Sequence, residues 1–263
     1  MRAPSDIVRE HWPEYLMEAA GLGLFMISAA VVTSLLEYPH SPLYQLLPDP
    51  VVRRVLIGMA MGLTAIGIIY SPWGKRSGAH LNPAVTMTFF RLGKIQGLDA
   101  LFYVLAQFAG GLIGLLVAAK GIGMAIEHPT VNYVVTVPGL NGTGIAFAAE
   151  AGISFGLMLV VLIVSSQTKL NTWTGVFAGA LVAAYITVEA PLSGMSMNPA
   201  RSFASALPAN LWTDFWVYLT APLLGMLLAA ECYVRFSGAR RVLCAKLYHD
   251  NDTRCIFCRS GMS

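Results

Sequence analysis

The tripeptide Asn-Pro-Ala occurs twice in the chain, as Asn82, Pro83 and Ala84 and again as Asn198, Pro199 and Ala200. Asparagine is among the best N-cap residues, and proline is favoured at the first helical position because its missing N–H is not needed there. One such pair is most simply a helix start. Two pairs facing one point would concentrate positive potential there, with the asparagine N–H groups placed to donate to a passing oxygen.

A single arginine accompanies the second tripeptide. Arg201 lies three residues after Asn198 and therefore on the same helix face, whereas the first tripeptide has Val85 at that position. An unpaired arginine near a bilayer is costly and is a functional hypothesis by default. The alternative is a structural arginine tied to carbonyls of the preceding loop. Both interpretations can hold, since a tethered guanidinium would be fixed at a pore wall.

The composition decides the class of protein that holds these residues. Of 263 residues, 56% are apolar and only 12% are charged, against about 25% charged residues in a soluble domain. The net charge is +3. Such a composition is typical of a polytopic membrane protein and disfavours a soluble enzyme, a nucleic-acid binder and a disordered scaffold.

Apolar runs long enough to cross about 30 Å of hydrocarbon recur along the chain. They predict membrane helices at Tyr15–Leu36, Val55–Tyr70, Ala100–Ala119, Gly144–Ser166, Thr172–Val188 and Phe215–Ala230. The first run contains Glu18 and lacks a cleavage pattern, so we expect a retained span rather than a signal peptide.

The segments Asn82–Arg91 and Asn198–Leu207 do not fit this count, because each is apolar but only about ten residues long. Ten helical residues rise about 15 Å, half the thickness of the hydrocarbon core. We therefore expect re-entrant half-helices, approached by the loops Ser77–Leu81 and Ser193–Met197.

The cationic residues predict the orientation, since Lys and Arg concentrate on the cytoplasmic side of membrane proteins. With six spans, the side of both termini holds thirteen of them: Arg2, Arg9, Lys75, Arg76, Arg91, Lys94, Lys169, Arg235, Arg240, Arg241, Lys246, Arg254 and Arg259. The other side holds four: Arg53, Arg54, Lys120 and Arg201. Both termini are therefore expected in the cytoplasm.

The two halves of the chain, about residues 12–120 and 143–236, echo each other. Glu18-Ala-Ala-Gly in the first is answered by Glu150-Ala-Gly in the second, and each half has one Asn-Pro-Ala. Because each half holds three spans, the second must be inserted upside down, so the half-helices enter from opposite faces. Inverted repeats with broken helices at the midplane mark a permeation or binding site.

The segments 77–86 (SGAHLNPAVT) and 197–203 (MNPARSF) closely resemble the two signature loops of the aquaporins, or major intrinsic proteins. The resemblance covers roughly residues 12–236 and implies an all-α channel domain over 1–236, with six membrane helices, two half-helices, a pore in each protomer and a homotetramer. Residues 237–263 would form a cytoplasmic tail. Ser202, Ala206 and Phe215-Trp216 match the water-channel pattern, which implies a prokaryotic-type, water-channel-like member.

The constriction departs from that pattern. Beside Arg201, the equivalent positions fall on Met195, Ile186 and Met61, with Gly62 as an alternative to Met61. Typical water-selective members resemble Phe, His, a small residue and Arg there, so the His donor is absent. A constriction formed by three apolar side chains and one arginine would either admit a solute other than water or be narrowed by the rotamers of the methionines. The alternative is that the methionines pack into the bundle.

Three other titratable residues carry competing interpretations. Glu18 and Glu150 lie inside predicted spans, where acidic residues can relay protons, but the resemblance assigns them to holding the loop backbone. His80 precedes the first Asn-Pro-Ala, where a loop-bracing hydrogen bond is favoured over a pH gate.

The tail carries Cys244-x4-His249-x5-Cys255-x2-Cys258. Three thiols and an imidazole at these spacings are suitable for a tetrahedral zinc site, although only the last pair is closely spaced. A reducing cytoplasm disfavours structural disulfides. The alternatives are a disordered tail with incidental thiols, palmitoylation and a redox role.

The sequence therefore predicts a passive channel for water, with other small neutral solutes as an open extension, in the cell (inner or plasma) membrane. The closest alternative is a channel mainly for glycerol, a metalloid acid, hydrogen peroxide or ammonia. A secondary transporter would need coupling groups, and no Asp or Lys lies within a predicted span. No enzyme activity, cofactor or nucleic-acid partner is expected.

Overall fold

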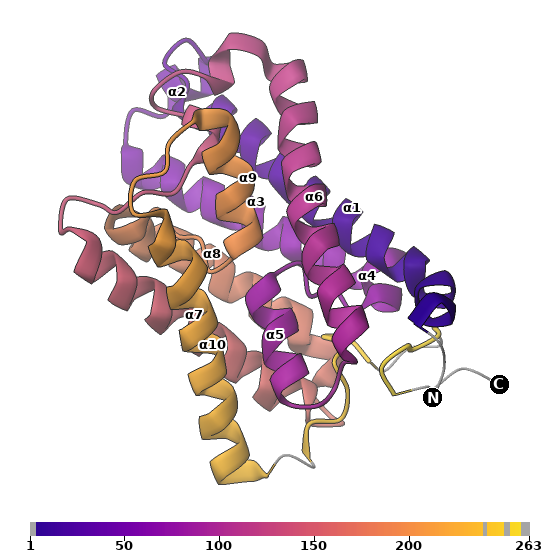
Figure 1. Ribbon diagram of the computed structural model, residues 1–263. Helices are drawn as coiled ribbons and strands as arrows, with labels where there is room; N and C mark the ends of the chain where they lie inside the picture. The colour runs from indigo at the N-terminus through magenta and orange to yellow at the C-terminus, as the bar shows by residue number, and fades with distance from the viewer. Residues whose placement is uncertain (1–3, 239–240, 250–252, 259–263) are drawn as a thin grey trace.

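The computed structural model describes residues 4–238, 241–249 and 253–258, and the regular structure within these ranges is entirely helical (Figure 1). Six of the described helices are long and apolar enough to cross a membrane, as the sequence predicts. They are α1 (Pro4–Glu37), α3 (Pro50–Tyr70), α6 (Gly97–Ile122), α7 (Thr143–Ser165), α8 (Thr174–Ser193) and α10 (Phe215–Ser237).

Helix α1 begins eleven residues before the predicted start at Tyr15. The added turns carry polar side chains that are buried and paired, which an apolar pattern does not report. His11 Nδ1 lies 2.8 Å from Asp99 Oδ1 at the start of α6, and Arg76 Nε donates to Glu14 Oε1 over 3.0 Å. The helix therefore extends beyond its membrane part because α6 and the segment before the first loop supply partners.

The two half-helices are α5 (Pro83–Arg91) and α9 (Pro199–Ala209). They begin close together and run away from each other, α5 towards the bottom and α9 towards the top of Figure 1. Their predicted ranges, Asn82–Arg91 and Asn198–Leu207, agree with these bounds to within two residues.

A capping residue followed by proline starts these helices and three others. Ser41, Asp49 and Ser71 cap α2 (Pro42–Leu46), α3 and α4 (Pro72–Ser77), each by accepting from a backbone N–H of the first turn. The sequence analysis did not predict α2, α4 or the 3-10 turns Gly123–Ile126, Asn132–Val134 and Asn171–Trp173.

The helices pack in matching pairs. Helix α1 lies along α6 and α7 lies along α10, while α9 packs on α6 and α5 packs on α10. A Cβ atom at Gly110 of α6 would lie 2.1 Å from the Ala19 carbonyl oxygen of α1, and one at Gly225 of α10 would lie 2.2 Å from that of Ala151 in α7. Glycine lets the backbones meet at equivalent places in both repeats.

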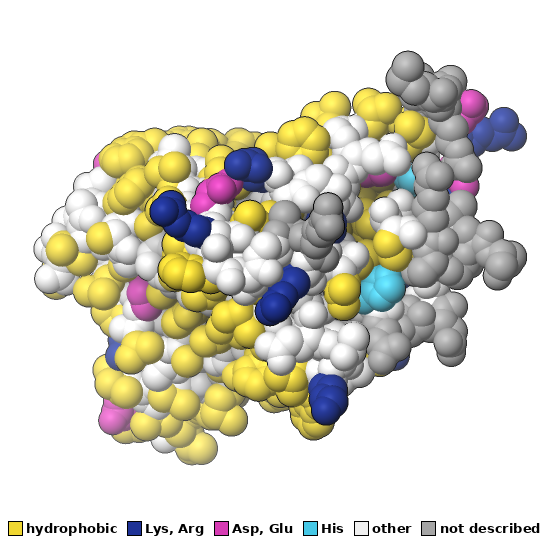
Figure 2. Space-filling model, turned by 90° about the horizontal axis from the view of Figure 1, so that it is seen from below, with side chains coloured by type: hydrophobic (Ala, Val, Ile, Leu, Met, Phe, Trp, Pro, Cys, Tyr) yellow, Lys and Arg dark blue, Asp and Glu magenta, His cyan; other side chains and the backbone are white. Residues whose placement is uncertain are grey.

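The bundle has two ends, which we name by the tail. The start of α1, the ends of α3, α5, α7 and α10, and residues 241–249 and 253–258 form the tail side. Helix α2 and the 3-10 turns at Gly123–Ile126 and Asn132–Val134 form the far side. Figure 2 shows the tail side, where Lys and Arg side chains are scattered among apolar ones. Of the cations assigned to this side, Arg2, Arg240 and Arg259 lie outside the described residues.

Candidate functional site

A cavity of about 420 Å³ passes between the helices. Its wall includes Glu37 and Arg54 on the far side, Asn82 and Asn198 at the centre, and Leu247 on the tail side. The wall is therefore supplied from both ends of the bundle, and the cavity passes the N-termini of both half-helices.

Asn82 and Asn198 cap their own helices and bind each other's loops. Asn82 Oδ1 accepts from Ala84 N over 2.8 Å, and Asn198 Oδ1 accepts from Ala200 N over 3.1 Å. Asn82 Nδ2 donates to the Met197 carbonyl and Asn198 Nδ2 donates to the Leu81 carbonyl, both over 2.7 Å. Each amide nitrogen carries two N–H groups, so a second donor remains on each for a molecule in the cavity.

The other residues of the two tripeptides serve a different purpose. Pro83, Ala84, Pro199 and Ala200 are buried in the first turns of α5 and α9, and they are not among the described residues that line the cavity. These four residues form the starts of the helices. Within each tripeptide, the asparagine is the residue that lines the cavity.

The loop before each half-helix is held by one buried glutamate. Glu18 accepts from the backbone N–H groups of His80 and Leu81, over 3.0 and 2.6 Å. Glu150 accepts from those of Ser196 and Met197, both over 2.7 Å. Neither glutamate is among the described residues that line the cavity. The structural interpretation of Glu18 and Glu150 is therefore the one that their contacts support.

These loops need such support because their backbones adopt an uncommon conformation. Ala79 and Leu81 have φ values of 53° and 52°, and Met195 and Met197 have 51° and 55°. Left-handed geometry is unfavourable for residues other than glycine. In both loops, two successive N–H groups donate to the glutamate, and the carbonyls of Leu81 and Met197 accept from the asparagine side chains.

The four predicted constriction residues, Arg201, Met195, Ile186 and Met61, all line the cavity. The neighbouring Gly62 faces α8, because its Cβ position lies 2.5 Å from the Gly179 carbonyl oxygen. Met61 and Met195 are only 2% and 6% exposed, since they also pack into the core. Each methionine therefore does both: it packs against neighbouring helices and also forms part of the cavity wall.

Arg201 presents a donor that the protein itself does not use. Its Nη1 atom is buried and has no hydrogen-bond partner within the described residues. A buried unpaired donor is costly, and this one lies on a residue of the cavity wall. A molecule in the cavity with an acceptor oxygen would satisfy it.

Residues 8–233 match the family described as Major intrinsic protein. The chain belongs to this family. It is 40% identical over 183 residues to aquaporin NIP6-1 of Arabidopsis thaliana, a match covering 68% of this chain and 58% of that protein. It is 35% identical to the probable aquaporin AqpM of Archaeoglobus fulgidus over 184 residues, 67% of this chain and 74% of that one.

A third relative is the glycerol uptake facilitator protein-like 6 of Lactiplantibacillus plantarum, 35% identical over 67% of this chain and 82% of its own length. For the Arabidopsis relative and the probable aquaporin NIP-type of Nicotiana alata, the chain covers 58% and 64% of the relative, less than two thirds. The aquaglyceroporin structure from Plasmodium falciparum matches with a TM-score of 0.68 at 19% identity, covering 85% of this chain and 95% of that one. That match supports the fold.

The residues that match the water-channel pattern of the major intrinsic proteins are not on the pore wall. Ser202 Oγ lies 2.7 Å from Thr136 Oγ1 and 2.6 Å from Ser196 Oγ, so it ties α9 to two loops. Ala206 is buried in α9. These markers shape the packing behind the pore, whereas the wall itself is formed by other residues.

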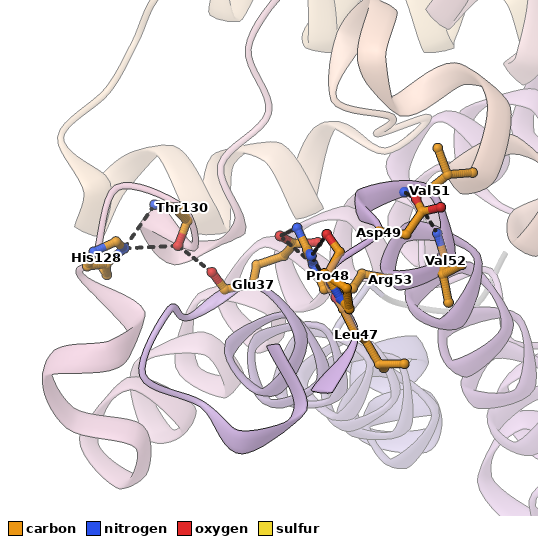
Figure 3. A network of polar contacts seen from close by, with 9 residues as sticks. All are labelled: Glu37, Leu47, Pro48, Asp49, Val51, Val52, Arg53, His128 and Thr130. Carbon is orange, nitrogen blue, oxygen red and sulfur yellow. Dashed lines mark hydrogen bonds and ion pairs between the residues drawn. The ribbon is translucent and has the colours of Figure 1, made fainter. Parts of the chain in front are cut away.

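At the far mouth, this major intrinsic protein has a polar network that the sequence analysis missed (Figure 3). Arg53 Nη1 donates to the Leu47 and Pro48 carbonyls over 2.8 and 3.0 Å, and its Nη2 pairs with Glu37 at 3.2 Å. Thr130 Oγ1 donates to the Glu37 carbonyl over 2.6 Å. Glu37 and Thr130 both line the cavity. No local pattern signals contacts between segments this far apart.

At the tail side, His80 links the first loop to the tail. Its Nε2 lies 2.7 Å from the Ala245 carbonyl oxygen and its Nδ1 lies 3.1 Å from Thr86 Oγ1. Its ring stacks on Phe89 and Phe257 at 5.1 and 5.5 Å. The bracing interpretation of His80 is therefore supported by its contacts.

The four tail residues considered for a metal come together. The ligand atoms of Cys244, His249, Cys255 and Cys258 all lie within 4.8 Å of one another. All four cysteines of the chain are described, and none is joined in a disulfide. The hydrogen bond between Cys244 and Cys255 lowers the pKa of Cys255 and raises that of Cys244.

Proposed function

We propose that this chain is a passive membrane channel for water and other small neutral polar solutes. The observation that carries the proposal is the cavity wall, on which Asn82, Asn198 and Arg201 offer N–H donors beside apolar side chains such as Val85, Ile186 and Met195. A neutral molecule can exchange hydrogen bonds at these places without meeting a group that binds it tightly.

The same wall disfavours ions. Two helix N-termini and the Arg201 guanidinium place positive potential along the path of a cation. The buried carboxylates of Glu18 and Glu150 accept from their own loops instead. An anion would lose its hydration against apolar side chains. Donors from both asparagines would also orient a water molecule at the centre, which interrupts proton transfer along a water chain.

Arg201, Met195, Ile186 and Met61 are proposed as the selectivity region. One donor faces an otherwise apolar ring, without a histidine. Such a ring suits a solute that has a carbon or metalloid centre on one side and hydroxyl groups on the other, as well as water. Glycerol or a metalloid acid as the main solute is thus a second candidate, favoured by this wall and, for glycerol, by the name of the lactobacillus relative.

The family resemblance implies that four protomers assemble, with both termini in the cytoplasm. Apolar side chains on the outer surface, such as Leu16, Leu63 and Ile113, are more than half exposed in the single chain, as lipid or neighbouring protomers would require. Light scattering of the detergent-solubilised protein tests the tetramer, and protease access to the tail in sealed vesicles tests the orientation.

Stopped-flow light scattering of proteoliposomes tests the function. Vesicles are shrunk with an impermeant osmolyte and then with glycerol, urea and boric acid. We expect faster shrinkage than in empty liposomes, and re-swelling that identifies the larger permeant solutes. Rates that follow an imposed proton or sodium gradient would indicate a secondary transporter and contradict the proposal.

A further inference from the structure

The tail holds four metal-ligand side chains in a space that fits one ion. Cys244 Sγ and Cys255 Sγ are 3.4 Å apart, and His249 Nε2 and Cys258 Sγ are 2.9 Å apart. A tetrahedral zinc ion bound at about 2.3 Å from sulfur and 2.0–2.1 Å from nitrogen places its ligand atoms about 3.5–3.8 Å apart. Small outward movements of these side chains therefore give coordination geometry.

The kind of ligand selects the kind of metal. Three thiols and one imidazole form a Cys3His set, which suits zinc, and the described cluster has no carboxylate, the ligand that calcium or magnesium prefers. Cys244 and Cys255 are buried, whereas Cys258 is exposed. The set is thus sheltered on one side and reachable from solvent on the other.

We propose that Cys244, His249, Cys255 and Cys258 bind one zinc ion, and that this ion clasps segments 241–249 and 253–258 together in the arrangement that packs on the tail-side end of the pore.

The ligands flank two of the segments by which the tail contacts the channel. Between Cys244 and His249, the Ala245 carbonyl oxygen lies 2.7 Å from His80 Nε2, and Leu247 N donates to the Gly78 carbonyl over 3.1 Å. Between Cys255 and Cys258, the Phe257 ring stacks on His80. Binding of the four ligands to one ion therefore holds these two segments in the arrangement in which they contact the first loop.

The described part of the tail, residues 241–249 and 253–258, has little regular structure of its own. Its described residues form only isolated turns, and Lys246 is buried with its Nζ donating to the Arg254 carbonyl over 2.8 Å. A unit this small rarely buries enough apolar surface to hold its shape, and a structural metal is a common substitute. Metal binding then supplies folding free energy directly.

The clasp has a consequence for flux, which rests on the function proposed above. Leu247 lines the tail-side end of the cavity and is only 6% exposed. With zinc bound, its side chain stays at the exit. Without zinc, the segment loses its clasp and the exit widens, so permeability rises.

Metal analysis of the full-length protein tests the site. The protein is purified under reducing conditions without a polyhistidine tag, and zinc is measured by mass spectrometry. We expect about one zinc per chain in the wild type and in the Cys232→Ser control, whose thiol lies outside the cluster, and less than a tenth of that in Cys255→Ser/Cys258→Ser. Cobalt substitution of the wild type should give the intense visible bands of a tetrahedral thiolate site.

Three outcomes of the metal analysis would overturn the site: no metal in wild type supplied with zinc, full zinc in the double variant, or iron with acid-labile sulfide in place of zinc. A Cys244–Cys255 disulfide in freshly isolated protein would do the same. Because the wild-type cobalt spectrum does not depend on a variant, a double variant that fails to fold leaves the site testable.

Hydrogen–deuterium exchange tests whether zinc holds the tail in place, independently of whether the tail limits water permeability. Chelation should speed exchange over residues 242–258 and 75–81 in the wild type and in Cys232→Ser, with no further change in the double variant. Unchanged exchange would refute the clasp. Chelation and Leu247→Ala should both raise water permeability; faster exchange with unaltered flux would refute the role at the exit. No flux above empty liposomes in any variant would instead contradict the proposed function and leave the zinc measurement standing.

Discussion

Glu18 and Glu150 hold the two pore loops in the same way. Glu18 Oε1 accepts from Ser77 Oγ over 2.8 Å, and Glu150 Oε1 accepts from Ser193 Oγ over 2.6 Å, while each carboxylate also accepts from two successive backbone N–H groups of its loop. The strained turns that aim the loops are thus fixed by one anion in each repeat.

Glu150→Gln should destabilise the protein strongly. The amide would replace an acceptor oxygen by an NH2 group that faces the donors of Ser196 or Met197. Hydrogen bonds to a charged group contribute about 1.5–3 kcal/mol each, so the apparent melting temperature in detergent should fall by roughly 5–10 °C.

Glu231→Gln is the matched control for that substitution. Glu231 pairs with Arg91 at 2.7 Å on the surface, where both side chains are more than half exposed. Surface pairs contribute only about 0–1 kcal/mol. Equal melting temperatures for the two variants would contradict the bracing role of Glu150.

Arg201→Val should make the pore less selective against cations. The substitution installs the residue type of Val85, its counterpart in the first repeat, and removes the only charge of the proposed selectivity region. A pH-sensitive dye inside proteoliposomes should report a proton leak that the wild type lacks, with water flux retained. Arg201→Lys keeps the positive charge, so its pore should remain impermeable to protons. A proton leak of the same size in both variants would argue against the electrostatic explanation.

Met195→Ala and Met61→Ala should widen the constriction and raise glycerol permeability several-fold. Both side chains line the cavity. The control is Met59→Ala, which alters a methionine of the same helix as Met61 that is 51% exposed on the outside. Glycerol re-swelling rates that change no more in the wall variants than in Met59→Ala would show that the methionines do not limit passage.

Gly110→Ala should separate α1 from α6. The new Cβ would lie 2.1 Å from the Ala19 carbonyl oxygen, which is backbone and cannot move aside alone. We expect loss of the monodisperse peak in size-exclusion chromatography. Gly121→Ala, on the same helix with nothing within 4 Å, should be neutral or stabilise by about 0.5–1 kcal/mol. Normal behaviour of the Gly110 variant would refute the close helix contact.

The features that could be predicted from sequence are those set by local chemistry. Asn82-Pro83 and Asn198-Pro199 define their helix starts because capping and proline act within one turn. The six spans follow from apolar length. Apolar length predicted the start of α1 at Tyr15, eleven residues too late. The turns before Tyr15 are stabilised by partners on α4 and α6 rather than by their own apolar composition.

The rest depends on contacts between distant segments. Spacing alone left Met61 and Gly62 as alternatives, and only the packing of Gly62 against α8 decides between them. Leu247 carries no local signal, yet it lines the cavity because the tail folds back onto the first loop. The contacts of Glu37 with Arg53 and Thr130 likewise cannot be predicted from the sequence, because they join segments that meet only in the folded chain.

In the proposed channel, solutes pass through the cavity lined by Asn82, Asn198 and the four residues of the proposed selectivity region. Ile186→Trp would fill this cavity at the constriction, whereas Ile113→Trp places the same bulk on α6 at a side chain that is 61% exposed on the outside. Water permeability of proteoliposomes should fall to that of empty liposomes for Ile186→Trp and stay at the wild-type value for Ile113→Trp. Wild-type permeability in the Ile186→Trp protein would contradict the account.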